Sequence, residues 1–410
     1  MGAITPVGND VATFWDSLKN GRCGIGPITK FDVSDFKVKL GAEVKDFDPT
    51  QYMEKREARR ADANVHYAMA AAIQAVEQAG LKEGNFDPYR TGVIFGSGVG
   101  GLHVAEQEVP KLLEKGPGRV SPFAIPEMIA NIAAAYISMH FGFKGENFCP
   151  VSACATGNHS IGEAMRAIRH GYQDVVVCGG TENGIIPISM AGFQNMKAVH
   201  MGDDPTAASI PFDARRSGFV MGEGAGCLVL ESLTHAQQRG ATILAEVAGY
   251  GASGDAYHIT SPSPDGEAAA HAIRSAIEDA GLTPADVDYI NAHGTSTPLG
   301  DKAETLAVNE KYETIAIKKA FGDEAYKVKV SSTKSMTGHL LGGAAAVEAI
   351  ACVMAIREGI VPPTIGYKEP DPECDLDITP NKAVEMPVNV AISNSLGFGG
   401  HNACILIKKV

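Results

Sequence analysis

The sequence lacks long hydrophobic runs, paired cysteines and an excess of positive charge. No apolar stretch approaches the roughly 18 residues of a membrane-spanning helix, and the chain does not open with a basic segment followed by an apolar run. Its eight cysteines are scattered, without a C-x-x-C pair or a histidine cluster at zinc spacing. This pattern argues against a disulfide framework and against a structural metal. We therefore expect a protein of the reducing cytoplasm that is neither exported nor membrane-spanning.

The charge balance is acidic and excludes several classes of partner. Lys and Arg number 35 against 48 Asp and Glu, a formal net charge of −13. Such a chain is repelled by nucleic acid and by anionic membranes, so any basic contact must be a local patch. With 410 residues, of which 45% are hydrophobic, the chain is long enough for two core-forming units.

A single thiol among small residues marks residues 151–162, which read V-S-A-C-A-T-G-N-H-S-I-G. Apolar residues then recur at helical spacing from Ile161 to Ile168, and Gly171 is a plausible helix stop. Cys154 should therefore lie at a helix N-terminus, where the dipole and free N–H groups lower a cysteine pKa from about 8.5 to roughly 3.5–7.5. A small buried hydrophobic residue is the alternative role for this cysteine.

Three further stretches are unusually polar or rich in glycine, and each follows a strand-like run. They cover residues 291–301, 331–339 and 393–402, after runs at 287–290, 326–330 and 388–392. Ligands collect at the carboxyl ends of strands in α/β sheets. His293 and His339 in these loops, with Lys334 nearby, would place two imidazoles beside a nucleophilic Cys154. A lone histidine in a polar loop is more often merely solvated, but two of them beside a helix-end thiol favour a site.

Two parts of the chain resemble two later parts in the same order. A-V-E-Q-A-G-L at 75–81 is echoed by A-I-E-D-A-G-L at 276–282. Likewise a helix that opens with T-G at 156–157 and ends in A-I-R-H-G is echoed by T-G at 337–338 and A-I-R-E-G at 355–359. Such self-similarity predicts two duplicated βαβ-rich halves, residues 1–240 and 241–410. Chance similarity between Ala- and Gly-rich helices is the alternative.

The remaining predicted elements lie mainly in the first half of the chain. We expect a loop at 2–9 with no strand before it, helices at 11–19, 51–65, 66–79 and 230–240, and strands at 91–95 and 243–250. The loop G-S-G-V-G-G at 96–101 matches a dinucleotide fingerprint, but the following chain does not, which favours a glycine-lined wall beside a ligand. In the 51–65 helix, four cations would share one face, as a docking patch or as a solvated face. They are Lys55, Arg56, Arg59 and Arg60.

Taken together, these motifs resemble those of the β-ketoacyl-acyl-carrier-protein synthases of fatty-acid synthesis, in particular the elongating type II enzymes. The resemblance runs through nearly the whole chain and rests on S-A-C-A-T-G, N-A-H-G-T-S-T-P-L-G-D, S-S-T-K-S-M-T-G-H-L-L-G and N-S-L-G-F-G-G. It implies an α/β thiolase-like fold, with two duplicated halves in an α-β-α-β-α arrangement. It further implies a cytoplasmic homodimer that uses no metal and no cofactor, because phosphopantetheine arrives on the carrier-protein substrate.

The resemblance also implies roles for individual residues. Cys154 would take the acyl chain as a thioester, and His293 and His339 would polarise the malonyl thioester as it loses carbon dioxide. Lys334 would orient the site, with Glu348 as its partner, unless it is an exposed lysine beside an unrelated glutamate. The N–H groups of Cys154 and Phe398 would hold the oxyanion.

Substrate and partner contacts follow from the same resemblance. Thr295 and Thr297 would bind the pantetheine arm, Phe398 with its neighbour Gly399 would gate the site, and Phe193 and Ala105 would line the acyl tunnel. The cations at 55, 56, 59 and 60 would dock the acidic acyl carrier protein.

Other enzymes of the same fold fit less well. A thiolase needs a second cysteine in the C-terminal glycine loop, and an initiating synthase has Asn in place of the second histidine. The sequence has neither feature, since Phe398 lies between glycines and His339 is present. A polyketide-type condensing enzyme shares the triad and stays open. A non-catalytic partner subunit would lack Cys154.

Overall fold

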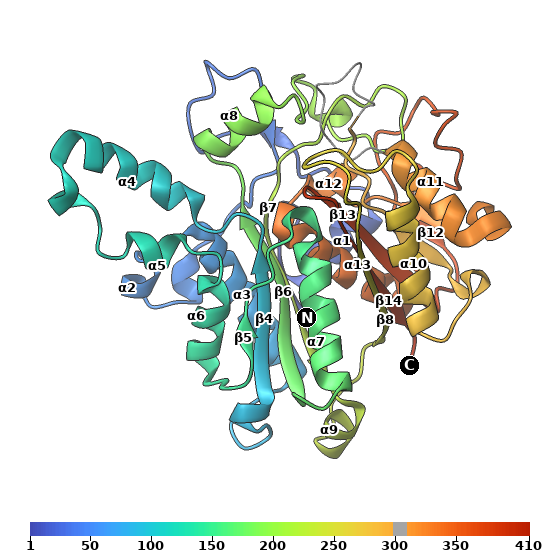
Figure 1. Ribbon diagram of the computed structural model, residues 1–410, viewed down its shortest axis with the longest axis horizontal. Helices are drawn as coiled ribbons and strands as arrows, with labels where there is room; N and C mark the ends of the chain where they lie inside the picture. The colour runs from blue at the N-terminus through green and yellow to red at the C-terminus, as the bar shows by residue number, and fades with distance from the viewer. Residues whose placement is uncertain (298–309) are drawn as a thin grey trace.

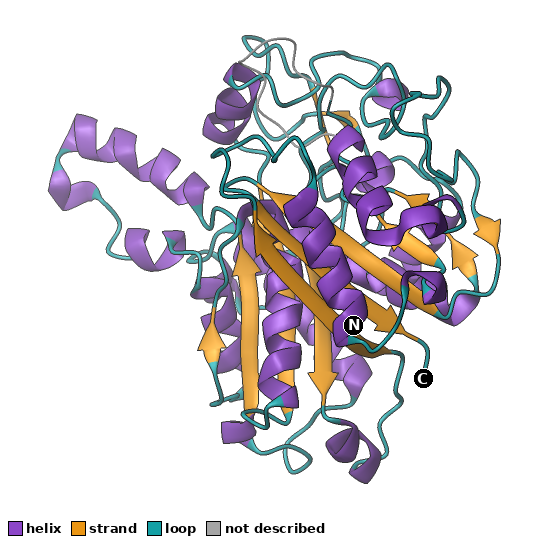
Figure 2. Cartoon of the chain, turned by 45° about the vertical axis from the view of Figure 1, so that its right-hand side comes forward, coloured by secondary structure: helices purple, strands orange, loops and turns teal. Residues whose placement is uncertain are grey.

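Two five-stranded sheets form the centre of the molecule in the computed structural model, which describes residues 1–297 and 310–410 (Figures 1 and 2). The first sheet has the order β1-β7-β6-β4-β5 and the second the order β10-β9-β13-β14-β8. The strands of the first are β1 (Gly2–Ile4), β4 (Thr91–Ser97), β5 (Asn147–Phe148), β6 (Val175–Asn183) and β7 (Glu223–Glu231). Those of the second are β8 (Glu246–Gly254), β9 (Tyr289–Asn291), β10 (Lys329–Ser331), β13 (Val390–Gly397) and β14 (His401–Lys408). Two short pairs, β2 (Gly26–Pro27) with β3 (Leu40–Gly41) and β11 (Ile360–Val361) with β12 (Val384–Glu385), lie outside them.

The two sheets repeat one topology, which confirms the predicted duplication. When the strands of each half are numbered in chain order, their spatial order across each of the two sheets is third, second, fourth, fifth, first. In both, the fifth strand is antiparallel to the fourth and to the first, while the second, third and fourth are parallel. The echoed A-G-L segments also match, because Gly80 and Gly281 end equivalent helices with the same positive φ of 68°. That conformation suits glycine, which has no Cβ.

Helices cover both sheets and fill the space between them. The longer ones are α1 (Val11–Lys19), α3 (Ala63–Ala79), α4 (Leu102–Lys115), α6 (Ile132–Phe141), α7 (Thr156–Arg169), α8 (Pro187–Asn195), α10 (Glu267–Asp279), α11 (Glu310–Phe321) and α13 (Ala344–Glu358). The shorter ones are α2 (Lys55–Ala58), α5 (Ala124–Met128), α9 (Leu233–Gln238) and α12 (Lys334–Thr337). One apolar cluster joins α7 and α13 to the inner faces of both sheets, and separate clusters join α3 and α6 to the first sheet and α10 and α11 to the second. The order of layers is therefore α-β-α-β-α, as predicted.

Several predicted elements have different bounds. Residues 2–4 form β1 instead of a loop, because they pair with Ala225 to Cys227 at the edge of the first sheet. β7 continues to Glu231, where pairing with Val175 holds it extended, so the helix predicted at 230–240 shrinks to α9. Tyr326 lies in a 3-10 turn (Gly322–Tyr326) before β10. The boundary at 240–241 stays a prediction; it falls between β7 and β8.

The helix predicted over 51–65 is absent from the structure. A 3-10 turn (Pro49–Gln51) and the single turn α2 replace it, and α3 begins only at Ala63, where the side chain of Asp62 caps the backbone N–H of Asn64 at 3.0 Å. An N-cap fixes a helix start, and Asp62 therefore separates the two helices. No helix in the described part of the chain combines the length and apolarity needed to cross a bilayer.

Candidate active site

Cys154 lies on a tight turn directly before α7. The turn is a 3-10 segment (Ala153–Ala155) in which Ala153 adopts a positive φ of 50°. A non-glycine residue in this region is strained, and such strain concentrates at functional sites. The hydroxyl of Thr156 accepts the backbone N–H of Ser152 at 2.9 Å and holds the turn in place. The predicted placement of the thiol at a helix N-terminus is therefore confirmed.

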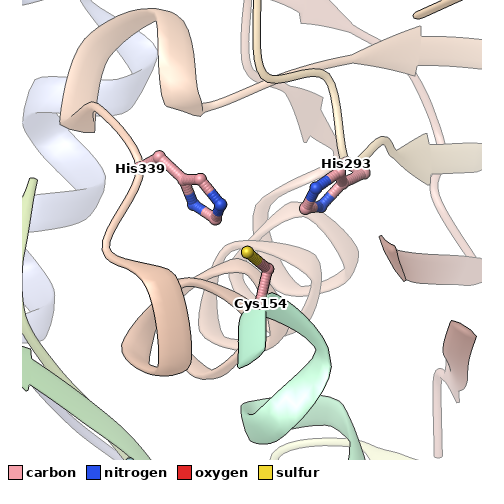
Figure 3. A group of neighbouring side chains, drawn as sticks. All are labelled: Cys154, His293 and His339. Atoms are coloured by element: carbon pink, nitrogen blue, oxygen red, sulfur yellow. The ribbon is translucent and has the colours of Figure 1, made fainter. Parts of the chain in front are cut away.

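Two imidazoles from the second half face this thiol (Figure 3). His293 follows β9, and His339 follows α12 after Gly338, which has a positive φ of 65°. The centres of the two rings lie 5.4 Å apart and their planes are inclined at 86°; one nitrogen of each ring and the Cys154 sulfur all lie within 4.8 Å of one another. The structure therefore brings the three residues into one small site, as the motifs predicted.

The backbone positions of both histidines are fixed by buried acceptors. The Glu313 carboxylate accepts the backbone N–H of His293 at 2.6 Å and that of Gly294 at 2.9 Å. The backbone N–H of His339 donates to the carbonyl of Val220 at 2.7 Å. Both rings are almost fully buried, at 2% and 3% exposure. The fold thus sets the backbone positions of both histidines before any substrate arrives.

The sulfur is a thiol in the free protein, contrary to the predicted lowering of its pKa. Burial raises the pKa of Cys154 to about 12, because the sulfur is 8% exposed and lies in an apolar cluster that includes Leu341. Glu182 adds to this rise, whereas Lys334 and the backbone N–H groups of Phe398 and Cys154 oppose it. Desolvation outweighs these groups. The predicted activation by the helix start alone is therefore wrong for the resting site.

Both imidazoles are neutral at pH 7. Burial is the largest cause, and it lowers the pKa of His293 and of His339 well below the usual value of 6.5; the Lys334 ammonium lowers both further. Each neutral ring has one N–H donor and one acceptor nitrogen. The Nδ1 atoms of both rings are buried and have no hydrogen-bond partner among the described residues.

Lys334 and Glu348 form an ion pair beneath the site, which is the contact predicted from the motifs. Lys334 is 1% exposed and its ammonium donates to the Glu348 carboxylate. Burial raises the pKa of Glu348 to about 7, and the lysine partly offsets this rise. A buried charge of this kind is retained only when it is paired. The pair keeps a positive charge close to both histidines.

A cavity of about 120 Å³ opens over the three residues, and it is lined mainly by apolar side chains. Of the predicted substrate contacts, Phe193, Thr295, Thr297 and Phe398 line it. The rings of Phe193 and Phe398 lie 6.4 Å apart. Phe219, which the motifs did not point to, packs edge-on against His339 at 5.4 Å.

Two other predicted contacts lie away from the cavity wall. Ala105 is half-buried in α4 and Gly399 lies in the turn between β13 and β14; neither is among the lining residues. Gly399 has a positive φ of 87°, and its N–H donates to the carbonyl of Ile259 at 2.7 Å. Their roles stay predictions. The last residues of the N-A-H-G-T-S-T-P-L-G-D motif, 298–301, lie outside the described residues.

The glycine loop after β4 forms a wall of the cavity, through Gly98 and Val99. The buried Glu182 carboxylate accepts the N–H groups of Gly98 at 2.8 Å and Val99 at 3.2 Å, together with that of Gly342 at 3.1 Å. These N–H groups are the donors that a bound phosphate would need. The loop therefore forms a wall beside the cavity, as predicted, and its N–H donors are bonded to Glu182 instead of being directed at a dinucleotide phosphate.

Glu182 and Glu313 are positioning residues that the sequence analysis missed. Glu182 ties the first-half glycine loop to the segment after His339, and Glu313 ties His293 to the side-chain amide of Asn394 at 2.9 Å. A glutamate at the end of the apolar run 175–181 was a usable signal for Glu182, because such a strand is buried on both faces. Glu313 lies in a mixed helix and gave no signal.

The four predicted docking cations do not share one helical face. Lys55 and Arg56 lie on the single turn α2, and Arg59 follows it; all three are exposed. Arg60 folds over Phe123, 4.4 Å from the ring centre, and is half-buried. Because the predicted helix breaks at Asp62, the patch consists of three exposed cations and one that packs on an aromatic ring.

Comparisons with known proteins cover the whole chain. Family models described as "Beta-ketoacyl synthase, N-terminal domain" and "Beta-ketoacyl synthase, C-terminal domain" match residues 1–236 and 244–368. A 3-oxoacyl-[acyl-carrier-protein] synthase 2 of Synechocystis sp. is 52% identical over 410 residues, which is 100% of this chain and 96% of that protein. A protein of the same name from Staphylococcus aureus strain N315 is 49% identical over 409 residues, 100% of this chain and 97% of its own.

Solved ketosynthase structures are similar to this chain over its whole length. A ketosynthase/chain length factor of the ishigamide system has a TM-score of 0.90 and 37% identity, covering 100% of this chain and 97% of that one. A type II polyketide ketosynthase, solved in complex with its acyl-carrier protein, has a TM-score of 0.90 and 32% identity over 100% and 98% of the two chains. These matches confirm the predicted thiolase-like fold.

Proposed function

Because the chain belongs to the β-ketoacyl synthase family, we propose that it elongates fatty acids by two carbons through decarboxylative condensation. An acyl chain and malonyl-acyl-carrier protein would give 3-oxoacyl-acyl-carrier protein and carbon dioxide. The observation that carries the proposal is the buried site in which the reactive atoms of Cys154, His293 and His339 lie within 4.8 Å of one another. The 52% identity to a 3-oxoacyl-[acyl-carrier-protein] synthase 2, against 32% to the type II polyketide ketosynthase, favours fatty-acid over polyketide synthesis.

The first step is transfer of the acyl chain to Cys154. Its sulfur attacks the thioester carbonyl, the bond to the sulfur of the phosphopantetheine arm breaks, and that thiol leaves with the proton that Cys154 gives up. The carbonyl oxygen becomes an oxyanion, for which the N–H groups of Cys154 and Phe398 are the donors. One such donor is typically worth about 2.7–4 kcal/mol in the transition state.

The second step forms the carbon–carbon bond. The malonyl thioester loses carbon dioxide, and the electron pair of the broken bond moves onto the thioester oxygen as an enolate. His293 and His339 are neutral donors that face this position. The enolate carbon then attacks the acyl-Cys154 carbonyl, the carbon–sulfur bond breaks, and the released sulfur takes a proton from water. No strong base is required, because decarboxylation itself generates the nucleophile.

The cavity supports roles for the surrounding side chains. Thr295 and Thr297 lie on its wall, with hydroxyl oxygens 3.1 Å apart, where they can bind the amides of the pantetheine arm. Phe398 and Phe193 face one another and would gate entry of the acyl chain. Lys334 would stabilise the enolate through its positive charge.

The partner is an acyl carrier protein, which is acidic. The chain itself is net negative, so the exposed cations Lys55, Arg56 and Arg59 are the local patch that can attract it. The solved ketosynthase in complex with its acyl-carrier protein supports this type of partner.

A second copy of the chain is the other proposed partner. Helix α4 and α5 project from the body (Figure 1), and apolar side chains are exposed along them and along β5. They include Val109 at 51%, Leu113 at 79%, Ile125 at 63% and Phe148 at 42% exposure. Patches of this kind mark interfaces, so we infer a homodimer. Light scattering should give twice the chain mass. No disulfide joins any of the eight cysteines, all of which lie in the described part of the chain, and this supports a reducing cytoplasm.

The test is intact-protein mass spectrometry after mixing with a long-chain acyl carrier protein. Wild type should gain one acyl mass, Cys154→Ala should gain none, and the matched control Cys149→Ala, which removes a half-buried thiol, should behave as wild type. Adding malonyl carrier protein should then release carbon dioxide and discharge the acyl group. An acyl adduct in Cys154→Ala would contradict the assignment.

A further inference from the structure

We propose that Cys154, His293 and His339 also form a reversible binding site for a soft divalent cation, Zn²⁺ in the first place, and that metal and acyl chain compete for the same sulfur. The competition rests on the proposed function, whereas metal binding itself does not. The three ligands do not show a zinc-site spacing in the sequence, because Cys154 lies in the first half of the fold and the two histidines lie in separate segments of the second half.

The geometry suits a three-ligand zinc site. Zinc binds sulfur at about 2.3 Å and imidazole nitrogen at about 2.0–2.1 Å in a tetrahedral arrangement, so its ligand atoms lie about 3.3–3.6 Å apart. The three atoms here lie within 4.8 Å of one another. An inward movement of about 1 Å, within the reach of side-chain rotation, closes the site. The fourth position would face the cavity and take a water molecule.

The ligands are also chemically available. Both imidazoles are buried, and both rings face the sulfur (Figure 3). Binding replaces the thiol proton, so one proton leaves for each metal bound. A thiolate with two imidazoles favours zinc and similar soft cations over Mg²⁺ and Ca²⁺, which prefer oxygen ligands.

Other features make the site exchangeable rather than structural. A zinc-binding histidine usually donates its second ring N–H to a carboxylate or carbonyl, and loss of that partner lowers affinity about 10–100-fold. The buried Nδ1 atoms of His293 and His339 have no such partner among the described residues. Lys334 places a positive charge nearby, which its pairing with Glu348 only partly neutralises.

Competition follows from the bonds at sulfur. In the acyl-enzyme the Cys154 sulfur is bonded to the acyl carbon and carries no negative charge, so it is a poor zinc ligand. Conversely, zinc withdraws electron density from a bound thiolate and so lowers its nucleophilicity toward a thioester. The metal should therefore bind only the free enzyme, and acylation should expel it.

The test uses Co²⁺ as the probe, because cobalt reports thiolate ligation by a near-ultraviolet charge-transfer band and tetrahedral geometry by intense visible absorption. Wild type and Cys23→Ser, which removes an exposed thiol outside the site, should each bind one Co²⁺ that Zn²⁺ displaces. Cys154→Ser should lose the near-ultraviolet band, and His339→Asn should lose at least about tenfold in affinity for Co²⁺ because a ligand is removed. The Cys23→Ser protein, alkylated with iodoacetamide until peptide mass spectrometry shows full modification of Cys154, should also lose the band.

Retention of the band in Cys154→Ser or in the alkylated protein would overturn the inference. Binding by wild type that is not relieved by acylation would overturn the competition alone. Failure of the proposed function is separately visible, because it removes the acyl mass while leaving Co²⁺ binding without substrate intact.

Discussion

The substitution Gly157→Ala tests how the fold brings the two halves of the site together. Gly157 lies in the first turn of α7, and an added Cβ would lie 2.8 Å from the backbone nitrogen of Ala346 and 3.0 Å from the Cβ of Ala345. Both neighbours belong to the first turn of α13, which follows the His339 segment. A contact under 3.0 Å with backbone forces one helix to move away from the other.

The expected magnitude combines two opposing effects. Alanine in place of glycine favours a helix by about 1 kcal/mol, whereas overpacking a rigid contact costs about 1–3 kcal/mol. We expect a net loss of about 1 kcal/mol or more in the free energy of unfolding. The matched control is Gly192→Ala in α8, where an added Cβ meets nothing within 4 Å. It should stabilise the protein by about 0.5–1 kcal/mol.

Urea unfolding of the three proteins measures the stability difference, and intact-mass kinetics measure the site. Because a shift of α13 displaces His339 from Cys154, condensation should fall more than acyl transfer, and a displacement near 1 Å can reduce a rate about 10²-fold. If Gly157→Ala is as stable as Gly192→Ala and condenses at the wild-type rate, the close approach of α7 and α13 does not hold the site together.

Three further changes probe the charges and donors of the site. His339→Asn should lower the condensation rate about 10²–10³-fold, measured as carbon dioxide release, while acyl transfer to Cys154 persists. The double change Arg56→Glu and Arg59→Glu should raise KM for carrier-bound substrate, more at low salt than at high salt, whereas Lys409→Glu at another exposed cation should not. Burial raises the pKa of Glu182 to about 6, so its native carboxyl binds a proton more tightly than in the unfolded chain. The stability of wild type relative to Glu182→Gln should therefore fall by about 2 kcal/mol as pH rises from about 4.5 to 7, in urea titrations across that range; a flat difference would contradict the assigned environment.

The sequence predicted the parts of the site that follow strand ends. His293 and His339 could be found because each lies in a polar, glycine-rich loop after an apolar run, and the carboxyl ends of strands meet at one edge of a sheet. The duplication was visible for a similar reason, since Gly80 and Gly281 are both required by left-handed helix ends. These features depend on local backbone chemistry, which a sequence contains directly.

Features that depend on burial were not predictable in the same way. The prediction of one helix over 51–65 did not take Asp62 into account. The side chain of Asp62 caps the start of α3 and so separates this helix from the cation-rich segment before it. Glu182 and Glu313 look like ordinary acidic residues in the sequence, yet each is only 1% exposed. Glu182 accepts backbone N–H groups from both halves of the chain, and Glu313 accepts the backbone N–H of His293 and the side-chain amide of Asn394. Whether a carboxylate is a surface charge or a buried acceptor depends on contacts from distant segments.

The thiol of Cys154 shows how such burial changes the chemistry. Burial raises the pKa of Cys154 to about 12 and lowers the pKa of both histidines well below 6.5, so the proton stays on the sulfur in the free enzyme. Ionisation must therefore be coupled to the substrate: negative charge that passes from sulfur to the carbonyl oxygen meets the N–H groups of Cys154 and Phe398, and the proton passes to the departing thiol. The helix start thus contributes through donors that act during the reaction, and the resting sulfur stays protonated.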